Sequence, residues 1–168
     1  IEELLDSQSA PAIWDKANRV LQSPQGTARA LIASSKVRAL CTTDDPADDL
    51  QYHKLLAEDK DFATQVLPTF RPDKILHVEN DEYPVYLQKL GAAAGVYIRT
   101  LDDVKTALKQ RLDYFASCGC RLSDQSFGSP DFTVWDEEAA QEAMNKALNG
   151  EKPLDYEVAA YQSLLMDF

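Results

Sequence analysis

The chain has 168 residues, 45% of them hydrophobic and 27% charged, which is enough for one ordinary domain with its own core. Its net charge of -11 repels phosphate backbones and argues against a nucleic-acid partner. No run approaches the roughly 20 apolar residues that cross a bilayer, and the opening IEELLDSQSA lacks the order of a secretory signal. The three cysteines follow no redox or zinc spacing, so we expect reduced thiols in a cytoplasmic protein without a membrane partner.

The first predicted elements are two leading helices within residues 9–35. Ser9 is placed to cap the first helix, and Pro11 suits its first turn. Apolar residues recur on one face of this helix: Ile13, Trp14, Ala17, Val20 and Leu21. The stretch TARALIASS, residues 27–35, predicts a second and shorter helix.

Residues 36–125 read as strands alternating with helices. The apolar run 37–42 predicts a strand that opens into the acidic loop TTDDP. Pro46 suits the first turn of a following helix that reaches about Glu58, and Asp48 and Asp49 would lie near the positive end of its dipole. Residues 62–70 predict a second strand, although the strand contains a proline.

Two helices and a short strand complete this βαβαβ pattern. Residues 81–95 predict a weak helix, whereas the helix after Thr100 has a capping pair in Thr100 and Asp103 and stops at Gly119. Its expected buried stripe consists of Leu101, Val104, Leu108, Leu112 and Phe115. The stretch CRLSDQ, residues 120–125, predicts a third strand.

Residues 126–168 predict a helical insertion that begins with the loop SFGSPDF. A helix over DEEAAQEAMNKALNG stops at Gly150, and PLDYEVAAYQSLLMDF begins another. The alternation of the preceding segments predicts an α/β fold with a parallel sheet and right-handed crossovers.

Each of the three predicted strands ends in polar residues, and ligands bind at that edge in parallel α/β folds. The residues concerned are Asp44, Asp45, Arg71, Asp73, Asp124 and Gln125.

Three motifs give the chain a resemblance to uronate (glucuronate) isomerases of the amidohydrolase superfamily. They are TTDDPADDL with the following YH, VLPTFRPDK, and RLDYFASCGCRLSD, in this order and spacing. The resemblance implies a (β/α)8 TIM barrel that interconverts D-glucuronate and D-fructuronate, or D-galacturonate and D-tagaturonate, by moving a proton between C1 and C2. It also implies a divalent ion, zinc, and a uronate sugar as the small-molecule partner.

The resemblance places the metal ligands, an HxH pair among them, outside residues 1–168. His53 and His77 are the only histidines, so an HxH pair is absent and we assign no metal ligand in this chain. A full barrel needs about 200 to 250 residues. We therefore expect a single internal segment of a larger barrel that contains three parallel strands, its strands two to four, and is inactive alone.

Arg71 is the expected substrate-binding residue, because a guanidinium grips a sugar carboxylate with two parallel hydrogen bonds. The alternative is that Arg71 only pairs with nearby carboxylates. Asp44 and Asp45 are expected to hold Arg71 in position, with orientation of substrate hydroxyls or proton transfer as alternatives. Asp73 is a further supporting candidate.

The remaining polar residues carry weaker expectations. Asp124 and Gln125 are weak candidates, since Gln125 stands where the resembled family often has histidine. His53 is expected to face solvent or pack on a helix two turns from the strand edge, and His77 is uninformative. The alternative for the whole chain is a catalytically inactive binding module, whose open sheet edges would need a partner. A homo-oligomer is possible for the full-length protein.

Overall fold

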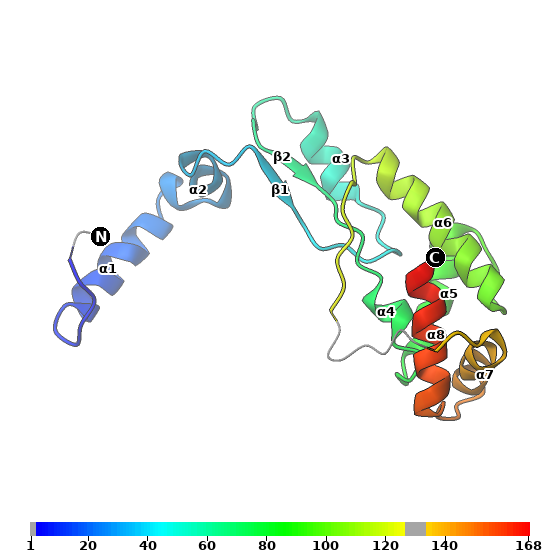
Figure 1. Cartoon of the computed structure of the whole chain (residues 1–168). Coiled ribbons are helices and arrows are strands. Elements are labelled where there is room, and N and C mark those ends of the chain that lie inside the picture. Colours follow the sequence, from blue (N-terminus) through cyan, green and yellow to red (C-terminus); the bar gives the residue numbers. More distant parts are fainter. Residues whose placement is uncertain (1–2, 127–133) are drawn as a thin grey trace. The chain divides into compact units, whose positions relative to one another are not determined.

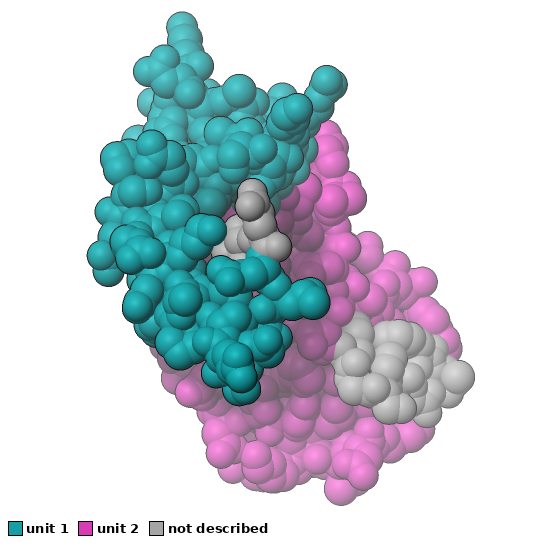
Figure 2. Space-filling view, turned by 90° about the vertical axis from the view of Figure 1, so that its left-hand side faces the viewer, with its two compact units in different colours: residues 1–40, 55–66 teal, residues 41–54, 67–168 magenta. Residues whose placement is uncertain are grey.

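The computed structural model describes residues 3–126 and 134–168, which excludes most of the predicted loop SFGSPDF. Figure 1 traces the chain, and Figure 2 colours its two compact units. Unit 1 comprises residues 1–40 and 55–66, and unit 2 comprises residues 41–54 and 67–168. No helix in the described part is long and apolar enough to span a membrane.

The leading helices of unit 1 are α1 (Ala10–Leu21), the 3-10 turn η1 (Pro24–Gly26) and α2 (Ala28–Ser34). Ser9 precedes α1 as predicted, but its side chain makes no cap bond to the helix. Thr27 does cap α2, because its hydroxyl accepts the N–H of Ala30 at 3.2 Å. These three elements occupy the residues in which two leading helices were predicted.

The apolar face predicted for α1 is buried only at Ile13. Trp14 is 70% exposed, and Val20 and Leu21 are also exposed. Within its unit α1 packs against η1, which is too short to cover the whole face. The periodicity of α1 therefore predicted the helix correctly but not the burial of these side chains.

Strand β1 (Ala39–Cys41) pairs with β2 (Gln65–Leu67). The pairing is parallel, because the N–H of Gln65 donates to the carbonyl of Arg38 and the N–H of Thr42 to that of Leu67. Beyond β2, Phe70 forms parallel bridges to Asp44 on one side and Ser123 on the other. The strand predicted over residues 62–70 is thus shorter than expected.

The prediction of a third strand over residues 120–125 is wrong. These residues form no regular strand and have a single bridge, at Ser123. The N–H of Cys120 donates instead to the carbonyl of Phe115, at the end of the preceding helix. The guanidinium of Arg121 donates to the carbonyl of Cys120. The N–H of Cys120 is therefore unavailable to a neighbouring strand, and its carbonyl already accepts one bond.

The helix after the acidic loop, α3 (Gln51–Glu58), begins later than predicted, so the placement of Pro46 in its first turn is wrong. Its first turn contains no acidic residue. Asp48 and Asp49 precede it, and their carboxylates accept the N–H groups of Leu50 and Gln51 at 2.7 and 3.0 Å. Leu50 is buried with a left-handed φ of 52°, which gives the chain its turn into the helix.

Unit 2 also contains α4 (Asp73–Leu76), α5 (Tyr83–Ala94), α6 (Leu101–Ser117), α7 (Glu137–Leu148) and α8 (Asp155–Asp167). The capping box predicted for α6 is present. Its stripe is buried except at Leu112, which is 39% exposed. Phe115 on this stripe meets the ring of Phe70 edge-to-face, with 5.2 Å between centroids, and so attaches α6 to the strand segment.

Candidate functional site

Several of the polar residues predicted at the strand ends meet around Phe70. Its two bridges place Asp44 and Ser123 on opposite sides, and Arg71 and Asp124 follow directly along the chain. All of these residues belong to unit 2. The sequence therefore predicted correctly that the ends of these segments come together at one edge.

Arg71 forms ion pairs with two carboxylates of this edge. Its Nη2 lies 3.2 Å from Oδ2 of Asp124, and its Nε lies 3.5 Å from Oδ2 of Asp73. The side chain remains 36% exposed, so solvent and small solutes reach it. Asp73 also accepts the N–H of Ser126 at 2.9 Å, which joins the two segments.

Two polar atoms at this edge are buried and lack a hydrogen-bond partner within the described residues. They are Nε of Arg71 and Oδ1 of Asp124. A buried polar atom that makes no hydrogen bond costs about 1–3 kcal/mol, and for Nε the ion pair with Asp73 at 3.5 Å offsets part of that cost. A bound molecule that supplied an acceptor to Arg71 and a donor to Asp124 would remove that cost.

Asp45 is directed away from Arg71. Its carboxylate accepts the Tyr86 hydroxyl at 3.0 Å and the N–H of Ala47 at 2.9 Å, and it lies 3.0 Å from Nζ of Lys74. Burial raises the pKa of Tyr86 well above its usual range, and the charge of Asp45 adds to the effect. Asp45 therefore fastens the acidic loop to α4 and α5.

Asp44 also differs from the prediction that its side chain holds the guanidinium. Its carboxylate accepts the Thr42 hydroxyl at 2.6 Å and the N–H of Thr69 at 3.1 Å. Arg71 meets Asp44 through the backbone, because the N–H of Arg71 donates to the carbonyl of Asp44 at 2.9 Å. The support of Arg71 by Asp44 is thus a backbone contact.

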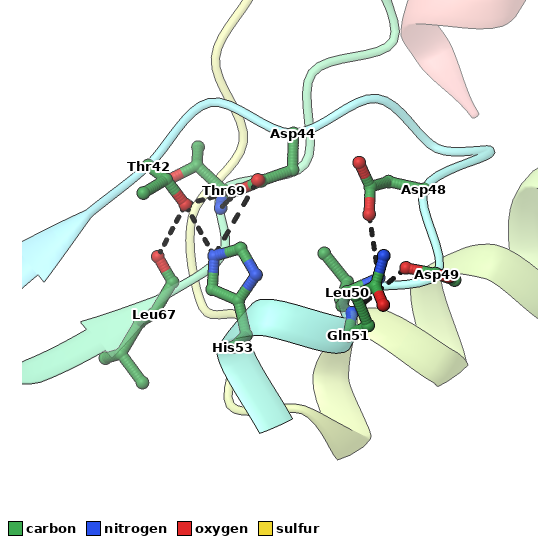
Figure 3. A network of polar contacts seen from close by, with 9 residues as sticks. All are labelled: Thr42, Asp44, Asp48, Asp49, Leu50, Gln51, His53, Leu67 and Thr69. Carbon is green, nitrogen blue, oxygen red and sulfur yellow. Dashed lines mark hydrogen bonds and ion pairs between the residues drawn. The ribbon is translucent and has the colours of Figure 1, made fainter. Parts of the chain in front are cut away.

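His53 is in this network, contrary to its predicted solvent-facing or helix-packing position (Figure 3). Its Nε2 lies 2.7 Å from Oγ1 of Thr42 and 3.7 Å from Oδ1 of Asp44. The prediction failed because α3 begins at Gln51, so that His53 occupies its first turn, whereas it was expected about two turns from the strand edge. No spacing signal in the sequence indicated this late helix start.

Arg111, which the sequence did not single out, anchors the acidic loop from α6. Its guanidinium donates to the carbonyls of Pro46, Asp48 and Ala93 at 2.6, 2.6 and 3.0 Å. The residue is only 7% exposed. A signal was present, since Arg111 lies on the same helix face as Leu108 and Phe115.

The other polar predictions have local partners. Gln125 donates from its amide to the Ser123 hydroxyl at 3.0 Å, and Nδ1 of His77 lies 2.8 Å from Glu79. Among residues 3–126 and 134–168, no three His, Cys, Asp or Glu side chains are grouped to hold a metal ion. The possible metal ligands among these residues do not form a divalent-ion site, and we assign no such site to them.

Comparison with known proteins gives the same family from sequence and from structure. A family model described as glucuronate isomerase matches residues 1–168. A uronate isomerase of Caldicellulosiruptor saccharolyticus is 42% identical over 168 residues, which are the whole of this chain and 36% of that protein. A uronate isomerase of Cellvibrio japonicus is 42% identical over 170 aligned residues, with 98% of this chain and 35% of that protein covered.

A solved uronate isomerase structure from Thermotoga maritima matches with a TM-score of 0.88 and 32% identity, over 99% of this chain and 36% of that one. A glucuronate isomerase structure from Caulobacter crescentus, at 21% identity, has the same fold with a TM-score of 0.83 over 98% of this chain and 34% of that one. The chain spans about a third of the length of the curated relatives it matches. With the family model covering all its residues, the chain belongs to the glucuronate isomerase family.

Proposed function

We propose that the full-length protein containing this chain is a uronate isomerase. It interconverts D-glucuronate and D-fructuronate, and D-galacturonate and D-tagaturonate, by transferring a proton between C1 and C2. The family match and the names of the relatives support this reaction. In this proposal the strand segments around Phe70 are strands two to four of a (β/α)8 barrel of the amidohydrolase type, and the present chain supplies one part of its substrate site.

The proposed role of Arg71 is to bind the carboxylate of the uronate. The observation that carries this role is the buried Nε without a hydrogen-bond acceptor among the described residues, on a guanidinium that is still partly exposed. A carboxylate offers the matching pair of acceptors, and charge-assisted bonds of this kind are short and strong.

Asp124 is proposed to orient the sugar. Its Oδ1 is buried without a described donor, and its Oδ2 already pairs with Arg71. A hydroxyl of the bound uronate would donate to Oδ1, next to the carboxylate held by Arg71. Asp44 and Asp45 are then supporting residues, which fix the backbone and the loop beside this pair.

The groups that accept and return the proton, and the residues that bind a divalent ion, are proposed to lie in the part of the protein outside this chain. The ion, zinc in this proposal, would polarise the sugar carbonyl when bound. We also propose that the protein is cytoplasmic, with neither nucleic acid nor membrane as a partner. A homo-oligomer of the full-length protein remains a prediction.

The test is Arg71→Met in the full-length enzyme, assayed with D-glucuronate. Loss of one or two charged hydrogen bonds should lower kcat/KM roughly 10- to 100-fold. D-glucose, which lacks the carboxylate, serves as comparison substrate, and any turnover of it should be unaffected by the substitution. Arg19→Met, at an exposed arginine of α1, is the matched control and should leave kcat/KM unchanged.

Unchanged kcat/KM in Arg71→Met would contradict the role of Arg71. Binding of uronates without turnover by the full-length protein would support the inactive binding module instead. Turnover of esters or amides rather than uronates would indicate a hydrolase.

A further inference from the structure

The partly buried cluster of His53, Thr42 and Asp44 lies beside the proposed substrate arginine without reaching it through side chains. We propose that His53 and Thr42 are positioning residues, which hold Arg71 in place through Asp44. This inference rests on the proposed role of Arg71 in binding the uronate carboxylate.

The direction of the hydrogen bonds follows from the contacts of Thr42. Its single hydroxyl proton has two possible acceptors besides His53, at 2.6 Å on Oδ2 of Asp44 and at 3.3 Å on the carbonyl of Leu67. The charged and nearer Asp44 is the stronger acceptor. The oxygen of Thr42 therefore accepts from His53, whose Nε2 must carry a proton.

Little water competes with this cluster. The side chains of His53 and Asp44 are each 11% exposed, and Oδ1 of Asp44 lies 3.7 Å from the same His53 nitrogen. His53 thus fixes the hydroxyl of Thr42, and that hydroxyl fixes the orientation of the Asp44 carboxylate. In Figure 3 the imidazole of His53 points from α3 toward Thr42 and Asp44.

Asp44 transmits this restraint to the segment that carries Arg71. Its backbone N–H donates to the carbonyl of Thr69 at 3.0 Å, and its carbonyl accepts the N–H of Arg71 at 2.9 Å. Its carboxylate adds a third bond, from the N–H of Thr69 at 3.1 Å. The carboxylate bond thus occupies the N–H of Thr69, the residue directly after Pro68.

Three hydrogen bonds of Asp44 thus hold Thr69 and Arg71, the residues on either side of Phe70. They fix the backbone position of Arg71, from which its side chain extends. If the Asp44 carboxylate rotates, the N–H of Thr69 loses its acceptor, and the two remaining backbone bonds hold the segment before Arg71 less tightly. A displacement of about 1 Å at a substrate-positioning group is enough to change rates by about 100-fold.

The test compares four variants of the full-length enzyme with D-glucuronate as substrate. His53→Leu and Thr42→Val remove the donor and the relay hydroxyl, and each should raise KM about tenfold with a smaller change in kcat. His53→Gln keeps an N–H donor at the position of Nε2, and Thr42→Ser keeps the hydroxyl. Both conservative variants should restore KM to within about twofold of the wild-type value.

A merely structural role predicts a different pattern. Variants that only destabilise the fold would lower the amount of active enzyme, and hence kcat, without a specific rise in KM. Thermal unfolding of each variant shows whether His53→Leu folds at all, and if it does not, the KM of Thr42→Val against that of Thr42→Ser decides the matter. Equal KM values in folded His53→Leu, His53→Gln and the wild type would overturn the inference.

Combining His53→Leu with Arg71→Met separates this inference from the proposed function. If His53 acts through Arg71, the double variant should have the same kcat/KM as Arg71→Met alone. Multiplied effects of the two substitutions would overturn the positioning role while leaving the substrate role of Arg71 intact. An unchanged kcat/KM in Arg71→Met would instead refute the substrate role, and the positioning inference with it.

Discussion

Tyr83 and Tyr161 form a buried hydroxyl pair that links α5 to α8. Their oxygens lie 2.6 Å apart, their rings meet edge-to-face at 5.9 Å, and the residues are 1% and 0% exposed. Burial is the main cause that raises the pKa of both groups above the usual value of 10.0. The neutral form of each tyrosine is therefore strongly favoured in the folded protein.

This pair predicts that stability falls at alkaline pH. Above about pH 10 the unfolded chain releases both protons while the folded chain keeps them, so each group lowers the free energy of unfolding by about 1.4 kcal/mol per pH unit. Thermal unfolding of the full-length protein between about pH 8 and pH 11 measures the effect. The loss should be smaller in the double variant Tyr83→Phe with Tyr161→Phe.

Tyr97→Phe is the matched control, because Tyr97 is 75% exposed, and it should leave the pH dependence unchanged. An equal alkaline loss in the wild type and the buried double variant would contradict the assignment of this loss to the pair.

The sequence predicted which side chains lie together where these residues belong to a recognised motif at the end of a predicted strand. Arg71, Asp73 and Asp124 lie together as expected. The prediction for His53 was wrong, because the position of this side chain depends on where α3 begins. The helix begins late because Leu50 adopts a left-handed conformation, which no sequence pattern indicated. Arg111 was missed because its partners are backbone carbonyls of a distant loop.

Helix α6 has the clearest local start signal among the helices and strands. The Thr100 hydroxyl accepts the N–H of Asp103 at 3.2 Å, and the Asp103 carboxylate accepts the N–H groups of Arg99 and Thr100, each at 2.9 Å. These bonds, the Arg99 N–H foremost, lower the pKa of Asp103. The capping box thus satisfies N–H groups that a helix start leaves without partners.

Thr100→Ala should therefore lower the free energy of unfolding by about 1 kcal/mol, which is the usual cost of losing an N-cap hydroxyl. Thr106→Ala, at an exposed site within the same helix, is the matched control and should be neutral or slightly stabilising, because alanine is the better helix former. Thermal unfolding of both variants of the full-length protein measures the difference. Equal unfolding temperatures would show that the cap contributes nothing.

Helices with local signals were predicted well, whereas β1 and β2 were predicted in place but longer than they are. Caps and apolar periodicity located α1, α6 and α7. Strands need partners, so the short β1 and β2 and the single bridge at Ser123 reflect backbone bonds that the sequence does not encode locally. The four-residue helix α4, after Pro72, was missed because it is too short to show a period.

For the chain as a whole, the motifs predicted the family, and the family match over residues 1–168 confirms it. Exposure of the apolar residues on α1 could not be predicted, because periodicity shows which face is apolar and not what covers it. Coverage of 36% of a relative's length agrees with the expectation that a full barrel needs more residues than this chain has.

In the proposed function, this chain contributes substrate contacts to an isomerase whose metal and proton-transfer groups lie elsewhere in the full-length protein. The most direct measurement is isomerisation of D-glucuronate by the full-length protein and by residues 1–168 alone, each with and without added zinc. We expect turnover by the full-length protein with zinc and none by residues 1–168 under either condition. Turnover by residues 1–168 alone, or its absence in the full-length protein with zinc, would contradict the claim.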